Sequence, residues 1–199
     1  MHPNPLFRSE DRALFEALID EIGFGMVFHT TPDGPRVAHV PLLSTGDGAL
    51  QFHLARGNAL TRHLDGATAL VTVNGPDAYI SPRWYDERDT VPTWDYVALE
   101  MEGRIRRMDD EGLEALLHAV IEKFEGRLEG EGWSADESSE ATWSRLFKGI
   151  VGFEMEVLAW RPTLKLSQKR TPAERERIAM GLETSGSLAL ARLMRSLAA

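Results

Sequence analysis

The sequence predicts a mainly β protein with flanking helices, in which an antiparallel sheet closes into a barrel. Its expected strands follow one another as hairpins, with helices at the ends and between them. That order favours antiparallel pairing over the strand–helix alternation of a doubly wound sheet. A chain of 199 residues with 43% hydrophobic side chains suffices for one substantial core, whereas two full domains would be cramped. One domain with appended helices is therefore expected.

The N-terminal part predicts a helix followed by a β-hairpin. A helix is expected to open at Ser9 and to stop at Gly23, because apolar residues recur between them at helical spacing. Residues 25–30 and 36–43 read as short strands. The intervening Thr31-Pro32-Asp33-Gly34 has the composition of a hairpin turn.

The next segment predicts three more strands. Residues 49–54 form the first, followed by a short helix that Asn58 can cap and that ends before Gly66. Residues 68–74 and 77–81 form the other two, on either side of a Gly-Pro turn.

The C-terminal half alternates long strands with helices. Residues 82–92 predict a charged loop, and 94–108 a strand with one buried face. A helix is expected after Asp109, and a last core strand over 150–158. Thr171 begins a capping box with proline at the first helical position, so a further helix starts there.

Composition excludes several classes of protein. The chain has no cysteine, which excludes disulfides, thiolate catalysis, cysteine-ligated zinc and iron–sulfur clusters. Its net charge of −9 argues against broad nucleic-acid binding, because clustered Lys and Arg supply most phosphate affinity. Residues 161–199 nevertheless carry eight basic and three acidic residues, a charge of +5, whereas the remainder is −14. The positive charge of this tail should therefore attract any bound anion.

Several familiar sequence signals are missing. No apolar stretch is long enough to cross a bilayer, and the N-terminal residues lack the order of a signal peptide, so a cytoplasmic location without a membrane is expected. There is no glycine-rich dinucleotide fingerprint, Walker phosphate loop, nucleophile elbow or His-Glu-x-x-His motif. A bound phosphate would depend on side chains and a short helix N-terminus.

The end of the strand at 49–54 has the ingredients of a phosphate site. Arg56 offers a charged fork, Asn58 offers a neutral donor, and the following helix start offers free backbone N–H groups. The alternative is that Asn58 is only a helix cap and Arg56 only a solvated charge.

Aromatic residues gather around the loop at 82–92. Tyr79, Trp84 and Trp94 have flat amphipathic side chains that suit stacking on a planar ligand or burial at a subunit interface. Ordinary core and loop anchoring explains them equally well.

Three histidines, His29, His39 and His53, fall on three successive expected strands. They raise the possibility of a metal site of the kind found in barrel oxygenases. Structural or cofactor-contacting histidines are favoured instead, since a facial metal site usually needs a carboxylate, and no metal is predicted.

The segment 160–170 places cations on an extended stretch just before a helix. Leu164 and Leu166 alternate with Lys165 and Ser167, so one face is buried and the polar face can reach a ligand. A solvated charge run is the alternative interpretation.

Seven short motifs, in order over nearly the whole chain, carry a resemblance to a known family. They are Phe7-Arg8 with Asp11-Arg12, Ala38-His39-Val40-Pro41, His53-Leu54-Ala55-Arg56-x-Asn58, Tyr79-Ile80-Ser81-Pro82-x-Trp84-Tyr85, Val91-Pro92-Thr93-Trp94-x-Tyr96-Val97, Gly149-Ile150-Val151-Gly152-Phe153-Glu154 and Lys165-Leu166-Ser167-Gln168. Together they resemble the PaiB-type FMN-binding negative transcriptional regulators, a branch of the pyridoxamine-phosphate-oxidase-like split barrels.

The resemblance implies a fold, an assembly and a cofactor. The fold is a six-stranded antiparallel split β-barrel over residues 1–170, which includes the N-terminal cover helix. Residues 171–199 form a helical tail packed on the barrel. The assembly is a homodimer with FMN between its subunits.

The resemblance also implies the residues around FMN. The phosphate would lie against the third strand and its following helix, at His53, Ala55, Arg56 and Asn58. The second strand would run along the flavin with His39, Val40 and Pro41. Trp94 and Asp95 would come from the partner subunit. The C-terminal segment would close the site with Lys165, Ser167 and Gln168, and Tyr79 would be a further contact.

The chain departs from the family pattern at two positions. Asp95 and Lys169 stand where the family usually has asparagine. A carboxylate near the flavin would disfavour the anionic reduced ring, because like charges repel in a low-dielectric site. An ion pair from Asp95 to Lys169 or to another cation would neutralise this effect.

Three functions stay open at this point. The resemblance implies a negative transcriptional regulator that binds FMN, with the basic tail as its only plausible DNA contact. A flavin-dependent oxidoreductase acting on a small molecule is the second, with Tyr79, Trp84 and Trp94 lining the substrate side. The third is a dimer that keeps the barrel without the cofactor.

Overall fold

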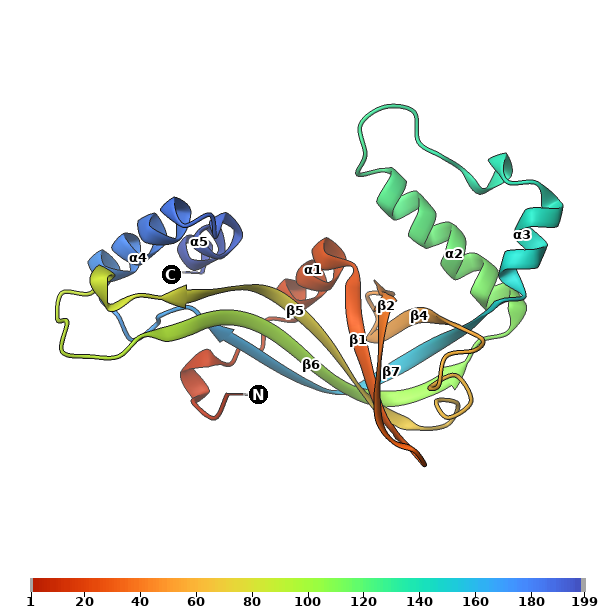
Figure 1. Ribbon diagram of the computed structural model, residues 1–199, viewed down its shortest axis with the longest axis horizontal. Coiled ribbons are helices and arrows are strands. Elements are labelled where there is room, and N and C mark those ends of the chain that lie inside the picture. Colours follow the sequence, from red (N-terminus) through yellow and green to blue (C-terminus); the bar gives the residue numbers. More distant parts are fainter. Residues whose placement is uncertain (1, 198–199) are drawn as a thin grey trace. The chain divides into compact units, whose positions relative to one another are not determined.

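Seven strands form one sheet in the computed structural model, which describes residues 2–197. The strand order is β2-β1-β5-β6-β7-β4-β3. Figure 1 labels each of these strands except β3. Helices lie before, between and after the strands, so the prediction of a mainly β protein with flanking helices is confirmed. The strands are β1 (Phe24–Thr31), β2 (Gly34–Pro41), β3 (Leu43–Ser44), β4 (Ala49–Ala55), β5 (Thr68–Ile80), β6 (Thr93–Arg107) and β7 (Ile150–Lys165). The α-helices are α1 (Arg12–Ile22), α2 (Asp110–Glu125), α3 (Glu140–Phe147), α4 (Pro172–Thr184) and α5 (Leu188–Ser196), and short 3-10 turns occur at η1 (Pro5–Phe7), η2 (Pro82–Trp84) and η3 (Ala135–Glu137).

The chain divides into two compact units, each described by itself. The sheet unit comprises residues 16–73 and 101–160, which carry β1 to β4, α2, α3 and most of α1. The terminal unit comprises the described parts of 1–15, 74–100 and 161–199, with η2, α4 and α5. The long strands β5, β6 and β7 contribute to both units.

The sheet unit contains two long antiparallel pairings, together with shorter pairings of β1 with β5 and of β3 with β4. β1 and β2 form a hairpin in register from Phe24↔Pro41 to Thr31↔Gly34, and the predicted turn lies at its tip. β4 pairs with β7 from Ala49↔Glu156 to Ala55↔Ile150. β2 also lies against β4, although these strands are not hydrogen-bonded neighbours, so the sheet curls without closing.

The prediction of six strands is wrong, because the described chain has a seventh, the two-residue strand β3. Leu43 pairs with Gln51 and Ser44 with Leu50. The turn between them contains Gly46 and Gly48, which both have positive φ angles that glycine adopts without strain. This tight reversal lets the chain pair immediately after β2.

The prediction that a turn at Gly75 separates two strands is also wrong. β5 continues from Thr68 to Ile80. Gly75 lies opposite Val97 of β6, and a Cβ at Gly75 would come within 3.0 Å of the Val97 Cβ. Glycine is therefore needed here because β5 and β6 approach each other closely. A glycine in the sequence can indicate either such an approach or a turn, and the pattern alone does not distinguish them.

Alternating apolar residues supply the core of the sheet unit. Leu50, Phe52 and Leu54 on β4 are buried, and the Phe52 ring stacks on Phe153 of β7 at a centroid distance of 5.7 Å. Ile19 of α1 is fully buried as well. The exposed residues of β4 therefore lie on the opposite face, as period-two alternation requires.

In the terminal unit, helix α4 begins with the predicted capping box. Thr171 accepts from the Glu174 N–H, and the Glu174 side chain accepts from the Thr171 N–H. Glu174 also accepts from the Asp86 N–H at 3.1 Å, which fixes the helix start to the loop after η2. Gly181 of α4 leaves space for Trp84, whose Cε2 would lie 2.2 Å from an added Cβ.

Gly103 in β6 should be essential for packing of β6 on β7. An added Cβ would lie 2.1 Å from the Glu156 carbonyl oxygen and 2.7 Å from Met155 Cγ. Gly103→Ala should therefore lower the free energy of unfolding by at least about 2 kcal/mol in urea denaturation. Gly57→Ala is the matched control, because nothing lies within 4 Å of its added Cβ. Equal stability of the two variants would contradict this packing argument.

Candidate functional site

Arg56 follows β4 and binds the chain that enters β7. Its Nε donates to the Lys148 carbonyl at 2.9 Å and its Nη2 to the Ile150 carbonyl at 3.0 Å. The side chain is exposed, and Nη1 has no recorded partner in the described part of the chain. Arg56 thus connects the end of β4 to the start of β7 and still has Nη1 as a further donor, so it is more than a solvated charge.

The helix predicted after Asn58 is absent, because this segment forms successive turns. The Asn58 side chain accepts from the Leu60 N–H at 2.9 Å, and Thr61 Oγ1 donates to the Ala55 carbonyl at 2.9 Å. These local bonds compete with helix formation. A helix N-terminus is therefore not available to bind an anion here, and Asn58 uses its oxygen in the turn.

His53 provides a buried polar group without a partner. It lies on β4 opposite Gly152 of β7, and its Nδ1 makes no hydrogen bond within residues 2–197. Burial lowers the pKa of the His53 imidazole, so the neutral ring is favoured. Buried polar atoms normally have a partner, and this nitrogen fits a hydrogen bond from or to a bound molecule.

The three histidines do not form a metal site. His29 Nδ1 lies 3.2 Å from the Thr68 carbonyl, and His39 stacks on Phe24. Among the described residues no group of three His, Asp or Glu side chains is placed to hold a metal ion.

The predicted β2 residues divide between two faces. His39 is exposed and parallel to the Phe24 ring, with an interplanar angle of 11° and a centroid distance of 6.5 Å. Val40 is 1% exposed and belongs to the core, so its backbone alone is available to a ligand. Phe24 and Phe28 of β1 are 50% and 37% exposed. The hairpin therefore presents a flat apolar face, to which Pro41 belongs by register.

Asp95 forms the centre of a buried polar cluster in the terminal unit. Its side chain is fully buried, Oδ2 accepts from Ser167 Oγ at 2.6 Å, and Oδ1 lies 3.7 Å from Lys165 Nζ. The Lys165 ammonium also donates to Thr93 Oγ1 at 2.5 Å and to the Trp94 carbonyl. The predicted cation beside Asp95 is therefore Lys165, not Lys169.

The backbone after β7 is shaped to make this cluster. Ser167 has a φ of +55°, a left-handed conformation that costs a non-glycine residue energy. Gln168 donates to the Leu164 carbonyl and accepts from the Leu166 N–H, which holds the turn closed. Ser167 and Gln168 are thus occupied by the turn and by Asp95.

Tyr79 and Trp94 lie on the exposed surface of the same unit. They are 48% and 55% exposed, and their rings meet edge to face at a centroid distance of 6.4 Å. Exposed aromatic pairs of this kind are available for stacking on a planar ligand.

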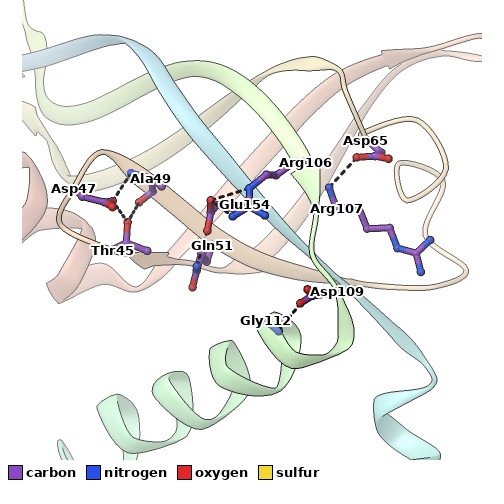
Figure 2. A network of polar contacts seen from close by, with 10 residues as sticks. All are labelled: Thr45, Asp47, Ala49, Gln51, Asp65, Arg106, Arg107, Asp109, Gly112 and Glu154. Carbon is purple, nitrogen blue, oxygen red and sulfur yellow. Dashed lines mark hydrogen bonds and ion pairs between the residues drawn. The ribbon is translucent and has the colours of Figure 1, made fainter.

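A polar network of the sheet unit was not predicted. Glu154 of β7 accepts from Arg106 of β6 at 2.6 Å and from Gln51 of β4 at 2.7 Å. Figure 2 shows these side chains. Glu154 borders a cavity of about 530 Å³ that also includes Arg104 and Glu156. The alternating charges of β6 were the only sequence signal, since Arg106 and Glu154 are 48 residues apart. Charges of both signs make this network a brace across three strands.

The sites predicted from sequence therefore fall into two groups. In the sheet unit, β2 lies against β4, so His39, Val40 and Pro41 share a region with His53, Ala55, Arg56 and Asn58. In the terminal unit, Asp95, Lys165 and Ser167 are in contact. Tyr79 and Trp94 meet each other, and Gln168 closes the adjacent turn.

The residues of the sheet unit fit a flavin mononucleotide. The unpartnered Nδ1 of His53 and the remaining Nη1 of Arg56 are suitable for polar groups at the end of β4. The flat apolar face with Phe24 and His39 is suitable for an aromatic ring system.

Comparison with solved structures defines the fold as that of flavin-binding split barrels. The FAD and heme binding protein from Mycobacterium smegmatis matches with a TM-score of 0.60 and 18% identity, covering 79% of this chain and 72% of that chain. The flavocytochrome Anf3 from Azotobacter vinelandii matches with a TM-score of 0.59 and 13% identity, covering 82% and 72%. At these identities the likeness concerns the fold.

Sequence comparison assigns the family. Residues 1–159 match the family described as "Putative FMN-binding domain", and the chain belongs to this family. It is 34% identical over 161 residues to "Protease synthase and sporulation protein PAI 2" of Bacillus subtilis (strain 168), covering 78% of this chain and 76% of that protein. The resemblance to PaiB-type proteins is confirmed, and so is the prediction of FMN as cofactor. Within residues 2–197 no helix combines the length and apolarity needed to cross a membrane.

The pH dependence of stability tests the charge state of Asp95. Burial raises its pKa above the ordinary 3.8, with Ser167 and Lys165 opposing this effect. The Asp95 carboxyl group therefore binds its proton more tightly in the folded protein than in the unfolded chain. As a result, the free energy of unfolding falls as the pH rises from about 4 through the raised pKa. In urea denaturation, the free energy of unfolding of the natural protein minus that of Asp95→Asn should decrease over this window and then level off. A difference that increases with pH would contradict the assignment.

Proposed function

We propose that the chain is an FMN-binding homodimer that acts as a negative transcriptional regulator of the PaiB type. The observation that carries FMN binding is the pairing of an unpartnered His53 nitrogen and a spare Arg56 donor with a flat apolar face on the neighbouring hairpin. The regulatory role is what the resemblance to PaiB-type proteins implies.

In this proposal each subunit contributes one side of the flavin site. Arg56 and His53 bind the phosphate end, with Ala55 and the Asn58 turn beside them. His39, the backbone of Val40, and Pro41 lie along the ring. From the partner subunit come Tyr79, Trp94, Asp95, Lys165, Ser167 and Gln168. FMN, when bound, supplies an electron acceptor that the protein's side chains lack.

In a homodimer, the partner subunit would cover the apolar face of the β1–β2 hairpin. Phe24, Phe28 and Val37 are 50%, 37% and 44% exposed, on paired positions of β1 and β2. Three apolar side chains exposed side by side on one hairpin suit a subunit interface. The ring of FMN and the partner subunit would together cover it.

The charges within the terminal unit shape how regulation can work. Arg195 binds both Glu176 and Glu183, Arg177 binds Asp86, and Lys165 pairs with Asp95. Much of the positive charge of the basic tail is thus paired with carboxylates of the same unit, which weakens the tail as a DNA contact. We favour a mechanism in which FMN or its redox state shifts the conformation of the dimer, through different affinities for two states. A regulatory role implies a cytoplasmic location.

Replacement of Arg56 tests the phosphate assignment. Arg56→Ala should weaken FMN binding about 10-fold or more in a fluorescence titration, because a charge-assisted hydrogen bond is lost. Unfolding of the variant must be measured too, since Arg56 also binds two carbonyls. Arg36→Ala, on an exposed arginine of β2, is the control. A folded Arg56→Ala variant with unchanged affinity would remove Arg56 from the site.

An FMN-dependent oxidoreductase is the second candidate function. The exposed Tyr79 and Trp94 pair favours it, because these rings are open to a second planar molecule. The two candidates predict different results with the flavin-loaded protein. A regulator should retard promoter DNA in a salt-sensitive, sequence-dependent way. An oxidoreductase should lose its flavin absorbance with NADH or NADPH and turn over with an acceptor. Turnover without DNA binding would reject the regulatory proposal.

A further inference from the structure

A cavity of about 390 Å³ lies wholly within the terminal unit, between β6 and the segment after β7. Its walls combine the Asp95 cluster with Lys169 and with the apolar side chains of Phe7 and Val91. A small organic molecule of about ten heavy atoms fits in this volume.

Asp95 lines the cavity and has one carboxylate oxygen without a hydrogen bond in the described part of the chain. Its carboxylate is fully buried, and only Oδ2 is hydrogen-bonded, to Ser167 Oγ. Oδ1 has no hydrogen-bond partner within residues 2–197, although Lys165 Nζ lies 3.7 Å away. A buried carboxylate oxygen in this state gains a hydrogen bond when a ligand brings a donor.

Lys169 offers the cavity an unused cation. The other basic side chains in the wall are already engaged: Lys165 by Asp95, and Arg170 by Glu174 at 3.6 Å and by the Tyr85 ring at 3.5 Å. Lys169 is exposed and has no recorded ion pair in the described part of the chain. It therefore leaves one positive charge near the solvent side of the cavity.

We propose that this cavity binds a small monoanion that carries a neutral hydrogen-bond donor, that is, a hydroxy acid with an apolar body. The donor would bind Asp95 Oδ1 and the carboxylate would bind Lys169. A neutral hydroxyl is preferred to an ammonium group, because Lys165 already lies beside Asp95 and would repel a second cation. Asp95 is also among the residues that the proposed function places beside FMN, but the contacts proposed here are those of the terminal unit and require no bound FMN.

The test compares three probes on the full chain: 4-hydroxybenzoate, benzoate and phenol. Calorimetric titration should show 4-hydroxybenzoate binding about tenfold or more tightly than benzoate, which lacks the donor, and than phenol, which lacks the anion. A separate FMN titration reports the proposed flavin site, so failure of one proposal is distinguishable from failure of the other.

Two variants assign the contacts. Lys169→Ala should weaken both acids similarly and leave phenol unchanged, whereas Lys148→Ala, an exposed lysine of the sheet unit, should change none. Asp95→Asn should reduce the preference for 4-hydroxybenzoate over benzoate, because a neutral amide is a weaker partner than a carboxylate. Circular dichroism checks that each variant is folded.

The outcomes that overturn the proposal are equal affinities for 4-hydroxybenzoate and benzoate, or unchanged binding in Lys169→Ala. Absence of binding at millimolar concentrations of all three probes overturns it too. Since Lys169 is exposed, its replacement is not expected to disturb folding, and the proposal stays testable even if Asp95→Asn unfolds.

Discussion

The buried Asp95 carboxylate is the constraint on which the terminal unit depends. It joins β6 to the segment after β7 through Ser167 and Lys165, and the Ser167 that binds it has a left-handed conformation. A buried charge is costly unless it is paired, so this turn and its lysine must stay in place. The same turn leads directly into the Thr171 capping box of α4. An asparagine at position 95 would need no such cation.

Charge is handled differently in the two units. In the sheet unit, Arg56 and Glu154 brace strands, while His53 keeps an unpartnered nitrogen beside an apolar hairpin face. In the terminal unit, Lys165, Arg177 and Arg195 pair with nearby carboxylates, whereas Lys169 has no ion pair in the described part of the chain. The sheet unit is thus the better candidate for FMN phosphate and ring, and the terminal unit for a smaller anion.

Sequence patterns predicted the hairpin order, the α4 capping box and the alternating burial of β4, because these depend on neighbours close in the chain. They failed at Gly75 and after Asn58, where strand approach and local turn bonds decide. They also left open whether Asp95 pairs with Lys169 or with another cation. Lys165 is 70 residues away along the chain, and only the folded strands select it. The site residues predicted through the family were placed in two groups, and their contacts with FMN stay predictions.

The central claim is that two copies of the chain hold FMN on the hairpin face. Size-exclusion chromatography with light scattering and absorbance detection tests it most directly. The account predicts about twice the chain mass of 22.2 kDa, flavin absorbance in the same peak and one FMN per chain. A monomer that stays colourless after incubation with FMN would contradict it.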